Sequence, residues 1–234
     1  MLIALVSPID AVAAALFSVH MTQHMLLIVV ASPLIALADA PIAMLWGLRL
    51  EQRKRIGLAW RHAHTLRAAW RQLQRPLVAW TLHVGALWLW HVPRFYDAAV
   101  RDERLHVLEH ASFFLTALLF WWLVTDRSRN RIGVGVATLY LFTAALQGTL
   151  LGALITIARH PWYFAHYGTT AAWGLTPLED QQLAGLIMWI PAGFAYVVAI
   201  IPTVLPVLRT RETSEERDQW ASPSVAGVSA RGTP

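Results

Sequence analysis

The sequence contains no cysteine, so it can form neither a disulfide nor a thiolate metal site. Any metal in this chain must therefore be held by histidine, methionine, carboxylate or backbone ligands. Charged residues are also scarce, at 14% of the chain against about 25% in ordinary soluble domains. No phosphate-binding glycine loop and no nucleophile–base pair stands out. Phosphoryl transfer and hydrolytic chemistry therefore have no support in the sequence.

Hydrophobic residues and tryptophan are abundant instead. The 234 residues suit one compact domain, 56% of them are hydrophobic, and the twelve tryptophans are typical of membrane interfaces. The net charge of +5 sits in short gaps between apolar runs rather than on one patch. This distribution argues against nucleic acid as a partner and for a protein embedded in the lipid bilayer.

Five apolar runs reach or approach the roughly 20 residues that a helix needs to cross a bilayer. Several contain proline, which membrane helices tolerate at kinks, and no period-two strand pattern competes. We therefore expect an all-α fold, a polytopic transmembrane helix bundle formed by residues 1–208. The five expected spans are residues 11–37, 76–90, 105–124, 132–158 and 181–208.

The basic residues in the connecting segments predict the orientation of the bundle. Residues 49–75 hold eight basic residues and one acidic residue, and residues 126–131 hold three basic residues. Residues 93–104 balance three basic against three acidic residues, and residues 160–180 hold no lysine or arginine. We therefore expect the two basic segments and the C-terminus to be cytoplasmic, and the other two connections to face outward.

Two polar segments have their own expected structure. Residues 49–75 combine arginines with Trp60 and Trp70, a composition typical of a basic helix on an anionic inner leaflet. Residues 209–234 are polar and then rich in Ser, Gly and Pro, so we expect a disordered cytoplasmic tail. The N-terminus lacks the features of a cleaved secretory signal and resembles the end of an earlier apolar segment.

Histidines gather toward the predicted outer face. Residues four apart on a helix differ by roughly 40° in direction and about 6 Å in height, so a pair at that spacing can face one ion. Two of the three predicted helices that carry histidine have such a pair. The six histidines at membrane depth are His20 and His24, then His83 and His91, then His106 and His110.

A His/Met donor set suits copper, as Cu(I) or Cu(II), and histidine alone also suits zinc. Met188 is expected at the depth of His83, below the outer histidines. Glu109 could bind a metal, orient a histidine or carry a proton. Simpler roles stay open: Met21 and Met25 as packing residues, His83 in a hydrogen bond between helices, and Glu109 paired with a nearby arginine.

Four stretches resemble the CtaG family of cytochrome c oxidase assembly factors, which is distinct from the cysteine-based copper chaperone of the same name. The stretches read SPID at 7–10, FSVHMTQHMLL at 17–27, HVLEHASF at 106–113 and DQQLAGLIMWIP at 180–191. The resemblance implies a multispanning protein of the bacterial inner membrane that helps to build the copper-containing oxidase. It also implies further membrane segments before the first histidine pair.

Together, the pattern and the resemblance predict a copper-binding assembly factor whose site lies near the periplasmic face. Its partners would be oxidase subunits or another copper protein, and a homo-oligomer is left open. The expected metal ligands are His20, His24, His106, His110, His91, His83 and Met188. The residues expected to support these ligands or to carry protons are Glu109, Asp10 and Gln182.

Three other functions remain open at this stage. Histidines on two helices could hold a haem, with Gly85, Gly148 and Gly152 providing space. A copper or proton-coupled transporter would need polar groups toward the inner side, where the sequence offers few. Copper held by histidines could also perform redox chemistry as an oxidoreductase, although an assembly factor without enzymatic activity is the leading prediction.

Overall fold

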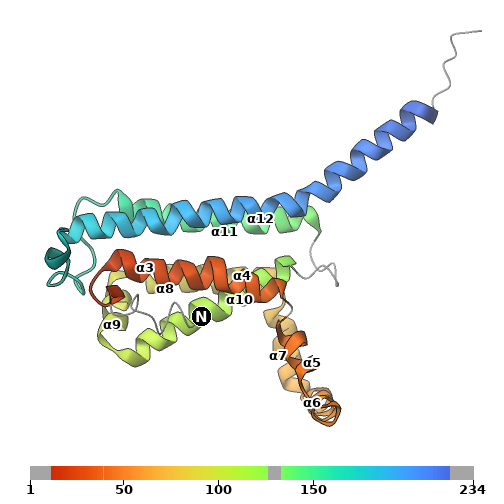
Figure 1. Ribbon diagram of the computed structural model, residues 1–234, viewed down its shortest axis with the longest axis horizontal. Coiled ribbons are helices and arrows are strands. Elements are labelled where there is room, and N and C mark those ends of the chain that lie inside the picture. Colours follow the sequence, from red (N-terminus) through yellow and green to blue (C-terminus); the bar gives the residue numbers. More distant parts are fainter. Residues whose placement is uncertain (1–11, 39, 126–132, 222–234) are drawn as a thin grey trace, which may run out of the picture.

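The computed structural model describes residues 12–38, 40–125 and 133–221, and over these residues it contains helices and no strands. The long helices lie side by side in one bundle, and α12 extends beyond it (Figure 1). This architecture confirms the predicted all-α fold. Asp10 lies outside the described residues, so its predicted supporting role stays a prediction.

Four segments of the bundle are long and apolar enough to cross a membrane. The first is Phe17–Leu37, which comprises α3 (Phe17–Met25), the π-helical stretch η1 (Leu26–Ala31) and α4 (Ser32–Leu37). The other three are α10 (Glu103–Thr125), α11 (Val134–Thr156) and the first part of α12 (Pro177–Ala221), up to Thr203. The fifth predicted span is the shorter helix α8, Pro76–Trp90.

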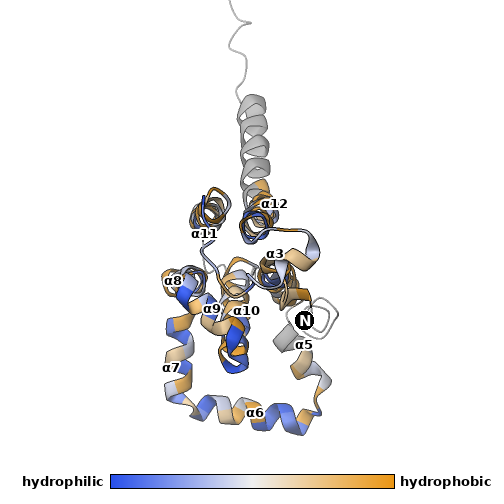
Figure 2. Cartoon of the chain, turned by 90° about the vertical axis from the view of Figure 1, so that its left-hand side faces the viewer, coloured by the Kyte–Doolittle hydropathy of each residue, from blue (hydrophilic) through white to orange (hydrophobic). Residues whose placement is uncertain are grey.

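The five segments form a closed ring. The α12 helix packs against α11 and α3, α10 packs against α4 and α8, and α8 packs against α11. Seen end-on in Figure 2, α11 and α12 lie on one side of the ring, with α3, α8 and α10 on the other. The side chains that line the interior come from all five segments and include Phe17, Phe113, Phe120, Leu141 and Met188.

Two glycines bring α11 and α12 into backbone contact. A Cβ atom on Gly185 would lie 2.7 Å from the carbonyl oxygen of Gly152 and 2.8 Å from the amide nitrogen of Thr156. A Cβ on Gly152 would lie 2.7 Å from Cβ of Trp189. Small residues allow such close approach, which strengthens the van der Waals packing on which helix association in lipid depends.

The first segment widens into a π-helical turn just before Pro33. The Ser32 amide donates to the carbonyl of Leu27, five residues back, and the Ser32 hydroxyl donates to the same oxygen at 2.7 Å. Proline lacks an amide hydrogen and its ring clashes with the preceding turn of an α-helix. A wider turn relieves this crowding, and it was not anticipated from the sequence.

Short elements close the end of the ring at which α3 begins. They are α9 (Pro93–Arg101) and the loop of residues 157–176, which contains the 3-10 turn η2 (Thr170–Trp173). Asp180, buried, accepts hydrogen bonds from the backbone amides of Phe17 and Ser18 at 2.7 and 3.1 Å. Because these amides are at the start of α3, where no helical carbonyl is available, this carboxylate fixes the beginning of the helix that carries the first histidine pair.

At the other end of the bundle, three helices form a frame beside the ring (Figure 2). They are α5 (Ala40–Gly47), α6 (Leu50–His62) and α7 (His64–Leu73). The predicted basic segment is therefore helical but broken at Ala63, which leaves the helical region at φ −78° and ψ 65°. The frame lies across the bundle axis, as interfacial helices do.

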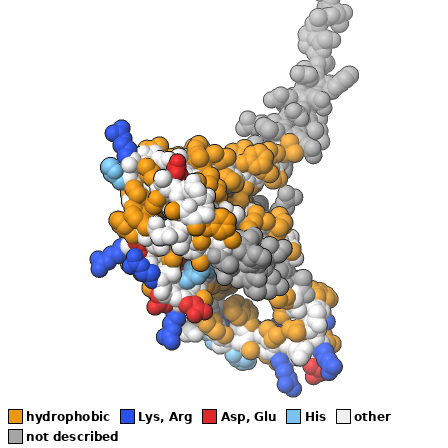
Figure 3. Space-filling model, turned by 60° about the vertical axis from the view of Figure 1, so that its left-hand side comes forward, with side chains coloured by type: hydrophobic (Ala, Val, Ile, Leu, Met, Phe, Trp, Pro, Cys, Tyr) orange, Lys and Arg blue, Asp and Glu red, His pale blue; other side chains and the backbone are white. Residues whose placement is uncertain are grey.

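Hydrophobic side chains cover much of the face shown in Figure 3, and lysine and arginine side chains project mainly at its edges.

The α12 helix continues to Ala221, so over residues 209–221 the structure differs from the disordered tail that the sequence predicts. This stretch has no Gly or Pro and is rich in Glu and Arg, both good helix formers. Residues 222–234 lie outside the described residues.

Candidate metal centre

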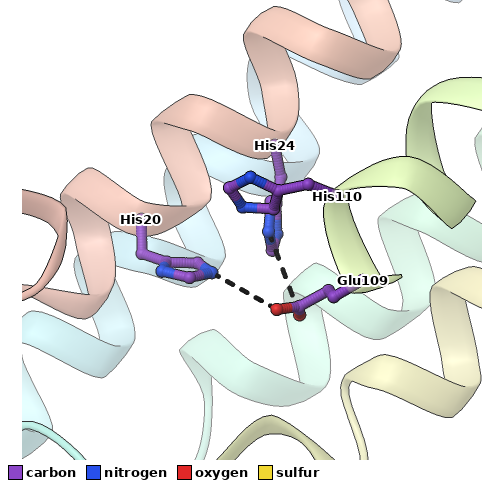
Figure 4. Close-up of side chains that lie close together, drawn as sticks. All are labelled: His20, His24, Glu109 and His110. Carbon is purple, nitrogen blue, oxygen red and sulfur yellow. Dashed lines mark ion pairs between the residues drawn. The ribbon is translucent and has the colours of Figure 1, made fainter. Parts of the chain in front are cut away.

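The two histidine-bearing stretches, residues 17–27 and 106–113, meet inside the ring. His20 and His24 come from α3, and Glu109 and His110 come from α10. One ligand atom from each of the four side chains lies within 4.8 Å of the other three. Figure 4 shows the imidazoles of His20 and His24 directed toward the carboxylate of Glu109, with His110 beside His24.

All four side chains are buried, and Glu109 and His24 have no exposed surface. Nε2 of His20 lies 3.8 Å and Nε2 of His24 lies 3.9 Å from the nearest carboxylate oxygen of Glu109. These separations exceed the 2.7–3.2 Å of a hydrogen bond. Among the described residues, both Glu109 oxygens, both His24 ring nitrogens and His20 Nε2 have no hydrogen-bond partner. A buried polar atom without a partner costs roughly 1–3 kcal/mol, which is unusual for several neighbours at once.

A bound cation would resolve this arrangement. Metal–nitrogen bonds of about 2.0 Å in a tetrahedral site place the ligand atoms about 3.3 Å apart. The observed spread of up to 4.8 Å therefore requires contraction by roughly 1.5 Å at most, which side-chain rotation can supply. Three imidazoles and one carboxylate provide a complete set of four ligands, so the residues present fit a transition-metal ion.

Aromatic rings and a fourth histidine lie around the cluster. The ring of His106 lies 4.3 Å from that of His110 and 5.2 Å from that of His20, which makes it a neighbour outside the four-residue set. The ring centroid of Phe113 lies 4.7 Å from that of His24, and the ring centroid of Tyr96 lies 5.3 Å from that of His20. These buried rings lower the local dielectric constant, which strengthens electrostatic interactions within the site.

Residues 1–210 match the family described as cytochrome c oxidase caa3 assembly factors. The chain belongs to this family. The match covers every membrane segment of the bundle and confirms the resemblance drawn from the histidine motifs. No curated protein and no solved structure matches the chain.

The other predicted ligands of this assembly factor lie next to the cluster or deeper in the bundle. His91 is adjacent, with its ring 6.4 Å from that of His24. His83 is deeper, where it contacts Thr116 and Tyr196 at 3.4 Å each. Met188 and His83 line the same small cavity, so the predicted match of their depths agrees with the structure.

Gln182 has a structural contact in the assembly factor. Its side-chain amide donates to the carbonyl of Ala158 at 3.2 Å, which ties α12 to the end of α11. It does not belong to the four-residue cluster. The sequence motif that includes Gln182 also includes Asp180 and Gln181, and these two neighbours carry the contacts at the end of the ring where α3 begins.

The loop of residues 157–176, called the covering loop below, makes contacts that the sequence did not predict. Tyr96 and His166 share a hydrogen bond of 2.8 Å, and the Tyr163 hydroxyl donates to the carbonyl of His91. Burial raises the pKa of Tyr96 and lowers the pKa of His166, so both side chains are uncharged at neutral pH. Asp97 accepts hydrogen bonds from the amides of Phe164 and Ala165, which anchors the same loop.

No local signal could have identified these contacts. Tyr96 and His166 are 70 residues apart in the chain, and neither belongs to a spaced pair. The acidic residues Asp97 and Asp180 are consistent with the outward-facing composition of their segments, but their amide partners depend on the fold. The loop matters because its contacts with Tyr96 and His91 place it next to the rings that surround the candidate metal centre.

Proposed function

We propose that this assembly factor binds copper through His20, His24, Glu109 and His110 and passes it to the oxidase or to another copper protein. The observation that carries the proposal is the convergence of four buried potential ligands, in which the Glu109 carboxylate lies 3.8 and 3.9 Å from the imidazoles of His20 and His24. Membership of the oxidase assembly family supplies the biological setting. Copper is favoured because the oxidase contains it and because imidazole ligands bind it well.

The chain's own residues account for capture and retention. The histidine pairs offer neutral nitrogen donors, and Glu109 supplies the negative charge that offsets a buried cation. The buried aromatic rings around the cluster strengthen this attraction by lowering the local dielectric constant. Copper delivery requires exchange of these ligands for those of the recipient, and the loop held by Tyr96 and His166 must open to permit it.

The proposed direction of transfer follows from the charge pattern. The basic helices α6 and α7 lie at the opposite end of the bundle from the start of α3, which carries His20 and His24, and basic connections stay on the cytoplasmic side. We therefore assign the cluster to the periplasmic end of an inner-membrane protein and the C-terminus to the cytoplasm. Copper would be received and passed on at the periplasmic surface.

Haem binding gains no specific support. The internal cavity lined by Met25, His83, Gly148, Met188 and Tyr196 has a volume of about 20 Å³. That volume holds about one water molecule. The space predicted beside Gly148 is therefore too small for a porphyrin, whereas a single metal ion needs none beyond its ligands.

Complementation in bacterial cells tests the proposed function. Cells that express a caa3-type oxidase but lack their own copy of the factor would receive the wild-type chain or the double variant His24→Ala/His110→Ala. We expect oxidase purified with the variant to contain less copper and to lose most of its activity. A matched control is His62→Ala/His64→Ala, which changes two histidines on the basic helices, far from the cluster. Full copper content with the cluster variant would overturn the proposal.

A further inference from the structure

Met21 and His91 meet directly beside the candidate metal centre. Nε2 of His91 lies 3.4 Å from Sδ of Met21. Both side chains are buried, with exposed fractions of 5% for His91 and 1% for Met21. Met21 follows His20 on α3, and His91 caps the end of α8, so two elements of the ring contribute the pair.

The hydrogen bond on the other side of the His91 ring fixes what Nε2 presents to the sulfur. Nδ1 of His91 lies 2.7 Å from the carbonyl oxygen of Leu87. A carbonyl can only accept, so Nδ1 carries the hydrogen and Nε2 of the neutral ring has a free lone pair. The thioether sulfur also has lone pairs and no hydrogen. A second proton on His91 would create a buried cation that forms no ion pair with any carboxylate of the described residues, which is costly.

Two lone-pair donors that face each other at this distance match the geometry of a metal site. Donor bonds of about 2.0 Å to nitrogen and 2.3 Å to sulfur, separated by a tetrahedral angle, place the two donors about 3.5 Å apart. The observed 3.4 Å requires almost no movement. The hydrogen bond from Nδ1 to Leu87 is the type of contact that orients histidine ligands toward a metal.

We propose that Met21 and His91 form a second copper station, selective for Cu(I), which rests on the proposed function of the neighbouring cluster. A thioether is a soft ligand, and soft ligands favour Cu(I) over Zn²⁺ and over Cu(II). The cluster itself has only nitrogen and oxygen donors and accepts harder ions.

The position of His24 connects the two stations. Its ring lies 4.9 Å from that of His110 in the cluster and 6.4 Å from that of His91. An ion can therefore exchange ligands between the stations without leaving the buried interior. Further inward, Met25, Met188 and His83 line the small cavity of about 20 Å³, so soft donors continue below the second station.

Anaerobic titration of the purified full chain with Cu(I), in competition with a chromophoric Cu(I) chelator, tests this station. The variants are Met21→Leu, which conserves volume, and Met44→Leu, an exposed methionine on α5 that serves as the matched control. We expect Met21→Leu to lose one equivalent of Cu(I), or at least tenfold in Cu(I) affinity, and to keep its Zn²⁺ binding. X-ray absorption of the Cu(I)-loaded wild type should show a copper–sulfur distance of about 2.3 Å that Met21→Leu lacks.

The outcomes separate the two proposals. Unchanged Cu(I) stoichiometry, affinity and copper–sulfur signal in Met21→Leu would overturn the second station. If His110→Ala then lost copper, the proposed function would stand alone. Loss of the copper–sulfur signal in Met21→Leu, together with normal binding of both Cu(I) and Cu(II) to His110→Ala, would support the station and contradict the cluster. A wild-type chain that binds no copper would overturn both.

Discussion

Glu109 is the residue whose role distinguishes a metal site from a cluster of histidines. Its carboxylate is fully buried, lies 3.8 and 3.9 Å from two imidazoles, and has no hydrogen-bond partner in the part of the chain that the structure describes. A structural carboxylate at this depth would be expected to hold a donor at closer range. A ligand carboxylate keeps its oxygens available for the ion.

The variant Glu109→Gln keeps the shape of the side chain and removes its charge. We expect copper affinity to fall at least tenfold, because a buried cation loses its only anionic neighbour in the cluster. Isothermal titration or chelator competition measures this. Glu103→Gln, an exposed position in the first turn of the same helix, is the control and should bind as the wild type does. Equal affinities for the two variants would count against ligation by Glu109.

His166 predicts a pH dependence of the covering loop. Because burial lowers its pKa when the loop is closed, the open loop binds more protons below about pH 6.5. The closed state therefore keeps its full stability above that pH and loses stability as the pH falls toward the lowered pKa. Hydrogen-exchange protection factors for residues 160–170 should decrease between pH 7.5 and pH 5. The variant His166→Gln should remove most of this dependence, and an unchanged slope would contradict the prediction.

At the residue scale, the spacing of the histidines along each helix predicted which helices contribute to the cluster. The pairs His20/His24 and His106/His110 identified both helices that build the centre, and three of these four histidines belong to the cluster. The spacing could not decide how α3 and α10 are rotated against each other. That rotation selects Glu109 as the fourth member and leaves His106 beside it.

Helix boundaries show how much element-scale structure the sequence contains. The α8 helix begins and ends where it was predicted, since a proline opens it and another begins the next helix. The π-helical turn of η1 and the extension of α12 to Ala221 were not predicted. The first depends on crowding next to Pro33, and the second on helix propensity that a search for apolar runs ignores.

The contact between α11 and α12 predicts a sharp difference between glycines. Gly185→Ala should destabilise the protein by about 1–3 kcal/mol, because its Cβ would meet backbone atoms of Gly152 and Thr156 that cannot rotate away. Gly85→Ala on α8 meets no atom within 4 Å and should be neutral or slightly stabilising. Thermal unfolding in detergent compares the two. A Gly185→Ala variant as stable as Gly85→Ala would show that the helices are further apart than described.

At the scale of the whole molecule, the closed ring and its orientation in the membrane decide from which side a metal ion can reach the candidate metal centre. The sequence predicted five spans in the correct order, but it could not predict that the ring closes through contacts between α3 and α12. These segments are far apart in the chain, and Asp180 joins them by hydrogen bonds to the start of α3. The side of the membrane follows only from the positive charges and stays a prediction.

The absence of cysteine makes the orientation directly measurable. Single cysteines can be placed at Ala171 in the outer connection and at Ala59 on α6, both exposed positions. We expect a membrane-impermeant maleimide to label Ala171→Cys in intact spheroplasts and to label Ala59→Cys only after permeabilisation. The reverse pattern would place the cluster at the cytoplasmic end and contradict the proposed periplasmic transfer.

Copper content per polypeptide is the decisive measurement for ligation by the four-residue cluster. The purified chain would be loaded with copper, freed of excess metal and analysed by mass spectrometry, beside His24→Ala/His110→Ala and the control His62→Ala/His64→Ala. Folding of each variant would be checked by gel filtration and thermal unfolding. We expect the wild type and the control to retain copper and the cluster variant to lose at least one equivalent. A folded cluster variant that retains as much copper as the wild type would contradict ligation by the cluster.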